Sequence, residues 1–530
     1  MYERILRMPD KIIVETQQNL HELKKQENTA HIDDIRVYFS MDSNSGLDVY
    51  VEAKQTPLKN IRLRWNISIP NDCRFLGDAL ERSYGDLEWR GLVPDRAMPW
   101  YFLMNNATTT IGYGVKVRPS SLCFWQVDTN GITLWLDVRN GGNGVVLGNR
   151  TLKICSIVNE VYEHTDPFIA TQNFCKVMCT DPILPKEPVY GFNNWYSSYG
   201  DISEQQVLED TDELCKIVGE NIDNRPFMVI DDGWQIAHKL NEYNGGPWHS
   251  GNSKFPDMKK LAQAIKKKNC KPGIWVRLLH TSDQELPSSW RLKKNYDVLD
   301  PSVPAVLDYI KQTIRLLVDW GYELIKHDFS TNDLFNCWGF QMNPSAPESD
   351  WEFADKSKTT AEIIINLYET ILDATDGHAY ILGCNCIGHL GAGLMHIQRI
   401  GDDVSGICWE RTRKYGINTL AFRLPQHKTF FDIDADCIGI TDSVPWRYNS
   451  QWADLIGRSG TPMFVSAKLQ CLSEKQRPKL IELFQINSKQ SDSIKPLDWM
   501  DTVCPSTWVI NGNIEKYDWY EENGLSSFHV

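Results

Sequence analysis

The sequence lacks the features that mark nucleic-acid-binding and membrane-spanning proteins. Lys and Arg total 55 against 69 Asp and Glu, a formal net charge of -14, whereas nucleic-acid binding favours the opposite sign. No run of about 18 consecutive apolar residues is present, so no membrane span is predicted. Residues 1–15 have no apolar run after a basic stretch, so we expect no signal peptide. No internal repeat or low-complexity tract is visible.

The sequence also lacks the paired CxxC motifs that are typical of structural zinc sites. Its 14 cysteines are scattered, and only Cys175 with Cys179 and Cys384 with Cys386 stand close together. Scattered cysteines are more often buried reduced thiols, which favours a reducing compartment. We therefore expect a cytoplasmic protein that holds no metal, and nothing in the sequence calls for an organic cofactor.

What the chain does contain is the material of a large globular protein. With 530 residues, of which 42% are hydrophobic and 23% charged, it is long enough for two or three domains. Aromatic residues reach 11%, including 19 Trp. Most of these Trp are expected in cores and interfaces, with a few left for a binding cleft.

The two ends of the chain have the pattern of β-structure. Residues 1–185 contain short segments that alternate apolar and polar positions and are separated by turns, which predicts an N-terminal β-sandwich. A Pro-rich stretch, 181–190, has the composition of a linker. Residues 486–530 are β-like again and predict a short C-terminal β region. The alternating segments of the sandwich are 35–40, 47–53, 61–69, 109–117, 132–139 and 152–163.

Residues 186–485 alternate apolar strands with helical segments, which predicts an α/β fold with a closed (β/α)8 TIM barrel. The main alternative is an open doubly wound sheet, but that fold usually begins with a Gly-rich phosphate loop, and here the first strand ends in Asn-Asn-Trp. The predicted strands are 189–195, 226–234, 271–278, 322–329, 379–385, 397–403, 436–440 and 461–466. The predicted helices are 204–220, 258–269, 303–321 and 359–374.

Ionisable side chains stand at the ends of several predicted barrel strands, where the active residues of such barrels lie. Asp231 and Asp232 end the second strand, and their adjacent carboxylates need cationic or hydroxyl partners. The alternative is that this pair caps a helix. Lys326 and Asp328 lie two positions apart on the fourth strand and so share a face. Lys326 would hold Asp328 ionised, as a nucleophile requires, unless the two form only a buried ion pair.

The other strand ends add aromatic, cationic and thiol groups. Trp195 follows the first strand, and the third strand carries Trp275, a candidate for substrate binding, and Arg277. The fifth runs into Cys384 and Cys386, where a metal site would need more ligands than the region offers.

The sixth strand brings two further carboxylates, Asp402 and Asp403, behind Arg399. Across a barrel, one of them would face Asp328 and form an acid/base pair, unless they belong to a solvated loop. Two opposed carboxylates are what glycosidases need, with a separation of about 5 to 5.5 Å for retention and about 6.5 to 9.5 Å for inversion.

Together, these segments resemble the α-galactosidase superfamily of glycoside hydrolases, the clan of families 27, 31 and 36, and most closely family 36. The ordered set of motifs covers most of the predicted barrel, and the sandwich and the short β tail fit the layout of the family. The matching segments are GFNNWYSSYGDIS (191–203), VIDDGWQ (229–235), KPGIWVRL (271–278), ELIKHDFS (323–330), RIGDDV (399–404) and SGTPMFVS (459–466).

The resemblance implies roles for the strand-end residues. The Asp of the K-x-D motif of the family, its nucleophile, corresponds to Asp328, and its Lys corresponds to Lys326. The DDGW carboxylates, which bind hydroxyls of the sugar in the −1 subsite, correspond to Asp231 and Asp232. The Trp that follows the first strand corresponds to Trp195.

The resemblance leaves the acid/base open between two residues. In relatives the Arg and the acid/base stand four positions apart, which favours Asp403 behind Arg399. Asp402 would then be a substrate-binding or supporting carboxylate. A Trp from the N-terminal domain reaches the cleft in family 36, and the candidate here is Trp100.

One segment departs from the family pattern. The Gly-rich stretch after strand five is CNCIGHLGAG (384–393) here, and this region usually shapes recognition of the sugar's C2 and C4 substituents. Cys384 is therefore a candidate for substrate contact, and galactose specificity is open.

The function that the resemblance implies is hydrolysis of α-linked, most simply α-galactosidic, residues by double displacement, with an oligosaccharide or glycoside as substrate. Four alternatives share the site: a raffinose-synthase-like transglycosylase, an α-N-acetylgalactosaminidase, an α-glucosidase or α-xylosidase like those of family 31, and a non-catalytic sugar-binding barrel. Family 36 proteins often form homo-oligomers, so a homo-oligomer also stays open.

Overall fold

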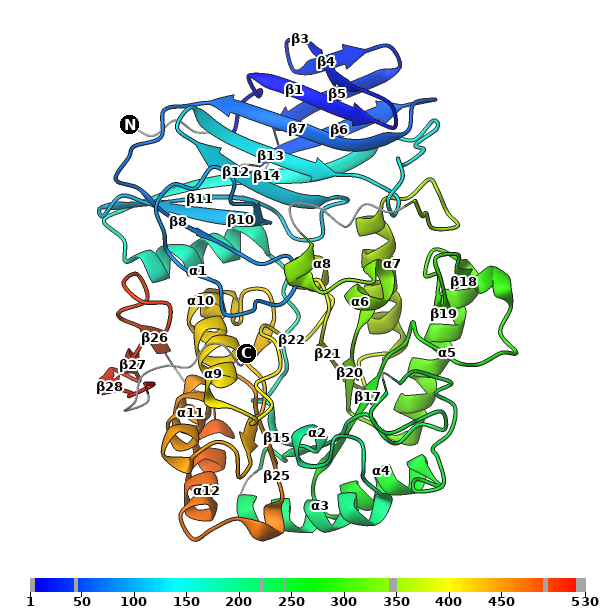
Figure 1. Cartoon of the computed structure of the whole chain (residues 1–530), viewed down its shortest axis with the longest axis vertical. Coiled ribbons are helices and arrows are strands. Elements are labelled where there is room, and N and C mark those ends of the chain that lie inside the picture. Colours follow the sequence, from blue (N-terminus) through cyan, green and yellow to red (C-terminus); the bar gives the residue numbers. More distant parts are fainter. Residues whose placement is uncertain are drawn as a thin grey trace.

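The computed structural model describes residues 5–41, 46–219, 223–242, 244–342, 350–489 and 494–520. The fold is mixed α/β and contains several sheets. Two antiparallel sheets come first, a curled parallel sheet with helices around it follows, and a small antiparallel sheet comes last (Figure 1). No helix in these described ranges is long and apolar enough to cross a membrane.

The first antiparallel sheet has six strands within the described residues, in the order β2-β1-β7-β13-β12-β9. These strands are β1 (Lys11–Thr16), β2 (Leu20–Glu22), β7 (Leu58–Asn66), β9 (Met98–Pro99), β12 (Leu122–Asp128) and β13 (Gly131–Asp137).

The second antiparallel sheet has eight strands in the same part of the chain, in the order β3-β4-β5-β6-β14-β11-β10-β8. They are β3 (Lys24–Gln26), β4 (Thr29–Ile32), β5 (Ile35–Met41), β6 (Leu47–Ala53), β8 (Arg74–Gly77), β10 (Tyr101–Asn105), β11 (Thr109–Val115) and β14 (Leu152–Glu163). All six segments predicted from alternation overlap one of the strands of these two sheets.

Helix α1 (Pro167–Met178), which the sequence pattern did not predict, covers part of the second sheet. It begins at the N-cap Asp166, whose carboxylate accepts the backbone N–H groups of Phe168 and Ile169. A Cβ at Gly112 of β11 would lie only 2.4 Å from the ring of Phe174, so the absence of a side chain there lets the helix approach closely. The helix closes the face of the sheet that points towards the rest of the chain (Figure 1).

The central sheet is parallel and curled, and among the described residues it runs in the order β23-β22-β21-β20-β17-β16-β15-β25-β24. Its strands are β15 (Tyr190–Asn193), β16 (Phe227–Ile230), β17 (Lys271–Val276), β20 (Leu324–His327), β21 (Tyr380–Gly383), β22 (Ile397–Arg399), β23 (Asp432–Asp434), β24 (Ile438–Ile440) and β25 (Met463–Ala467). Most of these strand residues are buried, because the sheet is covered on both faces.

Helices follow most of the parallel strands, and the four predicted helices lie at α3, α4, α5 and α7. The α-helices of this region are α2 (Trp195–Ser198), α3 (Glu204–Val218), α4 (Met258–Lys267), α5 (Pro304–Trp320), α6 (Ser330–Phe335), α7 (Thr360–Ala374), α8 (Gly388–Gly391), α9 (Trp409–Arg411), α10 (Thr419–Arg423), α11 (Trp446–Ser459) and α12 (Gln476–Asn487). Between them lie a π-helical segment, η3 (Thr412–Asn418), the 3-10 turns η1 (Ser288–Trp290), η2 (Gly339–Gln341), η4 (Leu424–Gln426) and η5 (Leu469–Cys471), and the hairpin of β18 (Arg291–Leu292) and β19 (Asn295–Leu299).

The prediction for the seventh barrel strand, 436–440, was wrong in its bounds. β23 pairs with β22 and β24 pairs with β25, and only residues 435–437 separate these two edge strands. Asp436 has a φ of 80°, which breaks the extended backbone between them. A pattern of apolar residues cannot show such a break, because Ala435 and Cys437 on either side are buried.

The C-terminal β region contains β26 (Ile494–Pro496), β27 (Thr507–Ile510) and β28 (Asn513–Lys516), which form an antiparallel sheet. Asn511 and Gly512 connect the last two strands with φ values of 50° and 80°, the conformation that a tight hairpin prefers. These strands lie within the range 486–530 for which β-structure was predicted, and residues 490–493 and 521–530 of that range lie outside the described ones.

A segment between β8 and β9 joins the first half of the chain to the end of β22. The backbone N–H of Ser83 donates to Ile400 O at 2.8 Å, and the N–H of Asp402 donates to Ser83 O at 3.2 Å. Arg423, at the end of α10, donates to Asp78 at 2.8 Å and to Ile400 O at 3.1 Å. These contacts fix the segment against the parallel sheet.

Replacement of Arg423 by Ala should destabilise the protein strongly. Asp78 would lose the cation that neutralises it in a buried site, although Gln426 still donates to it, and such losses cost about 3 kcal/mol or more. The control is Lys260→Ala, which removes only an exposed ion pair with Asp257 and should change the stability little. Urea unfolding measures the free energy of unfolding of both variants. Equal losses would contradict a role for Arg423 in the contact between the segment after β8 and the parallel sheet.

Candidate functional site

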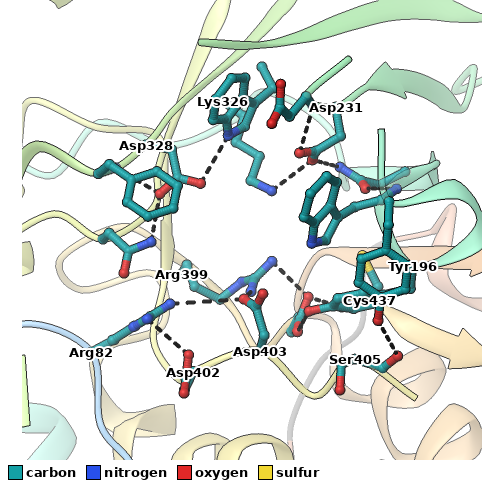
Figure 2. Close-up of a pocket in the computed structure, with 18 of the residues that line it drawn as sticks. Arg82, Tyr196, Asp231, Lys326, Asp328, Arg399, Asp402, Asp403, Ser405 and Cys437 are labelled. Atoms are coloured by element: carbon teal, nitrogen blue, oxygen red, sulfur yellow. Dashed lines mark hydrogen bonds and ion pairs between the residues drawn. The ribbon is translucent and has the colours of Figure 1, made fainter. Parts of the chain in front are cut away.

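A pocket of about 650 Å³ lies at the carboxyl ends of the parallel strands. Residues that follow β15, β16, β20 and β22 line it, together with Arg82 and Tyr84 from the segment after β8. Its volume falls in the range typical of small-molecule sites. Figure 2 shows Lys326 and Asp328 projecting from one side and Arg399 and Asp403 from the other.

The ammonium of Lys326 is buried at this pocket and pairs with Asp231. Its Nζ lies 2.8 Å from Asp231 Oδ2, and Asn193 donates to the same oxygen at 2.7 Å. Burial opposes the charge on Lys326, yet the Asp231 carboxylate keeps the pKa of Lys326 well above its ordinary value. The predicted cation is therefore present, but its direct partner is Asp231, which follows β16, two strands away from β20 in the sheet.

The carboxylate of Asp328 is held by hydrogen bonds at the floor of the pocket. Trp275 Nε1 donates to Oδ2 at 2.9 Å, Asn385 Nδ2 donates to Oδ1 at 2.7 Å, and the N–H of Phe329 donates to Oδ1 at 2.7 Å. Burial alone would raise the pKa of Asp328, but the nearby ammonium of Lys326 and the hydrogen bonds from Trp275 and Asn385 hold it below its usual range. Asp328 is therefore an ionised, oriented carboxylate.

Asp232 lies beside Asp231 and has its own set of partners. Gln235 Nε2 donates to Oδ1 at 2.6 Å, Asn244 Nδ2 donates to Oδ2 at 3.1 Å, and His238 Nδ1 lies 3.2 Å from Oδ1. The alternative that the Asp pair caps a helix is wrong, since the next helix, α4, begins at Met258 and is capped by Asp257.

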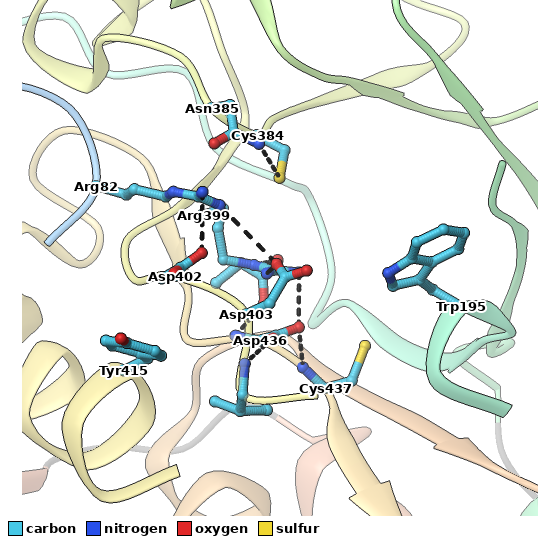
Figure 3. Close-up of polar contacts among 12 residues, drawn as sticks. Arg82, Trp195, Cys384, Asn385, Arg399, Asp402, Asp403, Tyr415, Asp436 and Cys437 are labelled. Carbon is cyan, nitrogen blue, oxygen red and sulfur yellow. Dashed lines mark hydrogen bonds and ion pairs between the residues drawn. The ribbon is translucent and has the colours of Figure 1, made fainter. Parts of the chain in front are cut away.

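A second charged cluster surrounds the guanidinium of Arg399, which is buried (Figure 3). Its Nη2 lies 2.7 Å from Asp436 Oδ1, its Nε donates to Asp434 at 3.1 Å, and its Nη1 donates to Asp403 at 3.3 Å. Tyr196 O–H also donates to Asp436. Burial and the neighbouring carboxylates of Asp403 and Asp434 raise the pKa of Asp436. Arg399 thus gathers three carboxylates, of which Asp403 is the most exposed, at 37%.

Arg82 connects the two carboxylates that follow β22 to the N-terminal half of the chain. Its Nη2 lies 2.9 Å from Asp402 Oδ1 and its Nη1 lies 3.9 Å from Asp403 Oδ1. Arg411 Nη2 also approaches Asp402, at 3.8 Å. Asp402 is therefore tightly paired, whereas Asp403 has only long contacts with its two arginines. Figure 3 shows Arg82 entering from the N-terminal part of the chain.

Strained backbone marks the same region. Phe329, Asn385 and Asp436 all have φ between 47° and 80°, a region that non-glycine residues rarely adopt. Each such residue costs about 1–3 kcal/mol and persists only when the surroundings enforce it. Phe329 and Asn385 donate to Asp328, and Asp436 pairs with Arg399, so these backbone conformations lie at residues that contact the charged groups of the pocket.

Nine of the eleven predicted site residues line the pocket. They are Trp195, Asp231, Asp232, Trp275, Lys326, Asp328, Arg399, Asp402 and Asp403. Their coincidence in one pocket comes from parallel strands that end at the same edge.

The other two predicted site residues, Trp100 and Cys384, do not line the pocket. Trp100 is fully buried, stacks on His389 at 4.8 Å and donates from Nε1 to Leu80 O at 3.0 Å, so it fills the interface behind the site. Cys384 is buried behind Asn385, and burial keeps the pKa of its thiol well above the ordinary value. Asn385 takes the place at the surface of the pocket that Cys384 was predicted to hold.

Several pocket residues escaped the sequence reasoning. Arg82 and Tyr84 come from the N-terminal half, where no motif marks them, and Asp436 was taken as the first residue of a strand. The polar loop after Trp234 supplies His238 and Asn244, and its only signal in the sequence was its length. Cys386, for which a metal was considered, lies 3.2 Å from the hydroxyl of Ser330 and from Cys384 O. Within the described ranges, no cluster of three His, Cys, Asp or Glu residues is arranged to hold a metal.

Glu81 is a buried carboxyl group next to this site. Its Oε2 accepts the N–H of Gly339 at 3.1 Å, while its Oε1 has no hydrogen-bond partner. Burial raises the pKa of Glu81 to about 7, and the nearby carboxylates of Asp328 and Asp402 add to that effect, against the charge of Arg82. Folding therefore favours the protonated form of Glu81 up to neutral pH.

Glu81→Gln should stabilise the protein at pH 8 and change little at pH 5. The pKa of Glu81 is higher in the folded state, so the folded protein retains the proton more tightly, and this stabilisation disappears as the pH rises through about 7. At pH 8 the neutral amide of the variant avoids a buried negative charge, which should raise the free energy of unfolding by about 1–3 kcal/mol. Thermal unfolding of both proteins at the two pH values measures the difference, and an equal difference at pH 5 and pH 8 would contradict it.

Comparison with known proteins supports the fold. No family model and no curated protein sequence matches the chain. Solved structures do: an α-galactosidase from Thermus thermophilus, TtGalA, in complex with p-nitrophenyl α-D-galactopyranoside, has a TM-score of 0.61 at 14% identity, over 96% of this chain and 99% of that one.

Two further solved structures have the same fold. The galactosidase domain of the α-galactosidase-sucrose kinase AgaSK gives a TM-score of 0.57 at 13% identity, over 92% of this chain and 70% of that one. A variant of the family 36 α-galactosidase AgaA from Geobacillus stearothermophilus was solved in complex with 1-deoxygalactonojirimycin. It gives a TM-score of 0.58 at 12% identity, over 96% of this chain and 80% of that one. The predicted resemblance to the α-galactosidase superfamily is therefore confirmed at the level of the fold.

Proposed function

We propose that the protein is a glycoside hydrolase of the α-galactosidase superfamily, similar to family 36, that cleaves α-linked galactosides with retention of configuration. The observation that carries this proposal is Asp328. It is a buried carboxylate of low pKa, held by three hydrogen bonds at the floor of a pocket on a fold shared with α-galactosidases. A nucleophile needs this combination of charge and fixed orientation.

The domain arrangement that we propose is a sandwich over 1–185, a closed (β/α)8 barrel over 186–485 and a short β region over 486–530. Closure of the barrel is supported by the two edge strands of the curled sheet, β23 and β24, which belong to one segment, 432–440. In such a barrel the pocket would lie at the face where active sites of this architecture are built.

In the first step, Asp328 would attack C1 of the α-glycoside and the acid would protonate the departing oxygen. In the second step, the same acid, now a base, would deprotonate water, which releases the sugar with its original α configuration. The pocket lining carries seven carboxylates against four Lys and Arg side chains, and this excess of negative charge suits a positively charged oxocarbenium-like transition state. Asp231, Asp232 and Lys326 would bind the sugar hydroxyls.

We assign the acid/base role to Asp403 and a supporting role to Asp402. The carboxylate of Asp402 is engaged in the 2.9 Å pair with Arg82, whereas a general acid needs a carboxyl group that can reach the glycosidic oxygen. Asp403 has longer contacts with its two arginines, is more exposed than Asp402 and stands four positions after Arg399.

Asp328→Asn should lower kcat by on the order of 10³-fold or more, because the neutral amide cannot form the glycosyl ester. A panel of 4-nitrophenyl α-galactoside, α-N-acetylgalactosaminide, α-glucoside and α-xyloside measures activity, and the wild type should favour the galactoside. The matched control is Asp432→Asn, a buried Asp of the same sheet outside the pocket, which should keep activity. Near-normal turnover by Asp328→Asn would refute the assignment.

Asp403→Asn and Asp402→Asn should differ in how their effect depends on the leaving group. Loss of a general acid costs roughly 10²–10⁴-fold, and the cost falls when the leaving group departs without a proton. Asp403→Asn should therefore lose much more kcat/KM on methyl α-galactoside than on the 4-nitrophenyl substrate, whereas Asp402→Asn should lose similar factors on both. If Asp402→Asn instead lost more kcat/KM on methyl α-galactoside than on the 4-nitrophenyl substrate, Asp402 would be the acid/base and Asp403 the supporting carboxylate.

A further inference from the structure

Four apolar or aromatic side chains in the pocket lining, Tyr84, Trp338, Phe340 and Ile407, form a surface that we call the outer wall. The rings of Tyr84 and Phe340 meet edge to face at 4.8 Å. Phe340 is 60% exposed and Ile407 is 58% exposed, so the wall presents apolar surface to solvent. Exposed apolar groups gathered at a pocket indicate a binding surface rather than a solvated loop.

The outer wall is held in place by specific contacts. Glu81 Oε2 accepts the N–H of Gly339, and the N–H of Trp338 donates to Gln341 Oε1 at 2.8 Å. A Cβ at Gly339 would lie 2.6 Å from Glu81 Oε2, so the close approach depends on glycine. Phe340 is thus held at the pocket by the turn η2.

The wall adjoins the two carboxylates that follow β22. Arg82 pairs with Asp402, donates to the hydroxyl of Tyr84 at 3.2 Å, and lies over the rings of Tyr84 and Trp338 at 5.5 and 5.4 Å. Ile407 follows Asp403 by four positions. A group that leaves towards these carboxylates would therefore leave along the outer wall.

Several polar groups on this side are already engaged with other groups of the protein. The hydroxyl of Tyr84 accepts from Arg82, Arg82 pairs with Asp402, and Arg411 Nε donates to Asp403 O at 2.8 Å. The surface of the outer wall that a ligand can contact consists mainly of aromatic rings and the side chain of Ile407. The floor of the pocket differs, because it is built from carboxylate, ammonium and amide groups that suit hydroxyls.

We propose that the outer wall binds the leaving group, and that its preferred ligands are aryl or other flat apolar aglycones rather than a second sugar. This inference rests on the proposed function, since the acid/base candidates define the side on which the leaving group departs. A second sugar would bring hydroxyls that lose water and find fewer partners on this wall than on the floor of the pocket, whereas an aromatic ring would cover Phe340 and Tyr84 without burying hydroxyls.

The test compares benzyl and methyl glycosides of the sugar that the wild type hydrolyses best. Benzyl alcohol and methanol have nearly equal acidity, so a difference in kcat/KM reports contact with the ring and not leaving-group chemistry. A disaccharide with the same non-reducing sugar is the third substrate. We expect the wild type to favour the benzyl glycoside over both others by roughly tenfold, the upper range for an aromatic pair.

Phe340→Ala should reduce the benzyl-to-methyl ratio severalfold. The matched control is Tyr296→Ala, which removes another exposed ring, 62% accessible, that does not line the pocket and should leave the ratio unchanged. A benzyl-to-methyl ratio near one in the wild type, an unchanged ratio in Phe340→Ala, or preference for the disaccharide would overturn the inference, while the proposed function would stand.

Calorimetric binding of benzyl and methyl α-galactoside to Asp328→Asn keeps the inference testable if no glycoside is cleaved. Failure of every substrate to react would refute the proposed function but would leave the inference about the outer wall to the binding measurement. Tighter binding of the benzyl glycoside, lost in the Asp328→Asn, Phe340→Ala double variant, would still support the outer wall. Equal binding of the two glycosides would overturn it.

Discussion

The ammonium of Lys326 is buried at the pocket, and a buried cation is tolerated only when carboxylates neutralise it. Asp231 provides the direct pair on one side, and the field of the same ammonium lowers the pKa of Asp328 on the other. One cation therefore orders Asp231, the proposed sugar-binding carboxylate, and Asp328, the proposed nucleophile, at once. The parallel strands make this possible, because β16, β17 and β20 end at one edge and carry their last side chains into the same space.

Arg399 has the corresponding role on the facing side, with Asp403, Asp434 and Asp436 around it. Arg82 completes this side from outside the parallel sheet, so the site depends on the contact between the N-terminal sheets and the end of β22. Because Glu81, Arg82 and Tyr84 belong to one short segment, the same contact also places the outer wall. Packing between distant parts of the chain thus supports both the proposed chemistry and the proposed aglycone site.

The strands of the curled sheet and the residues at their ends could be predicted, because alternation, length and spacing carry that information locally. The two-residue spacing shows that Asp328 and Lys326 share a face. The ion-pair partner of Lys326 depends on the order of the strands in the sheet, which the spacing of residues along the chain does not reveal. The sequence pattern did not predict β10 and β12, because nearly all of their residues are buried and their side chains therefore do not alternate between apolar and polar. Arg82 and Asp436 reach the pocket through a long-range contact and a backbone break, and Trp100 fills an interface that only the packed structure defines.

The central claim is that Asp328 forms a covalent bond to the sugar. A 5-fluoro-α-galactosyl fluoride tests it most directly, since the ring fluorine slows both steps and the fluoride leaves readily, which allows the intermediate to accumulate. Mass spectrometry of the intact protein, followed by peptide mapping, should find one added glycosyl group on the peptide that contains Asp328. An adduct on another residue, or turnover without an adduct and with an inverted first product, would contradict the account.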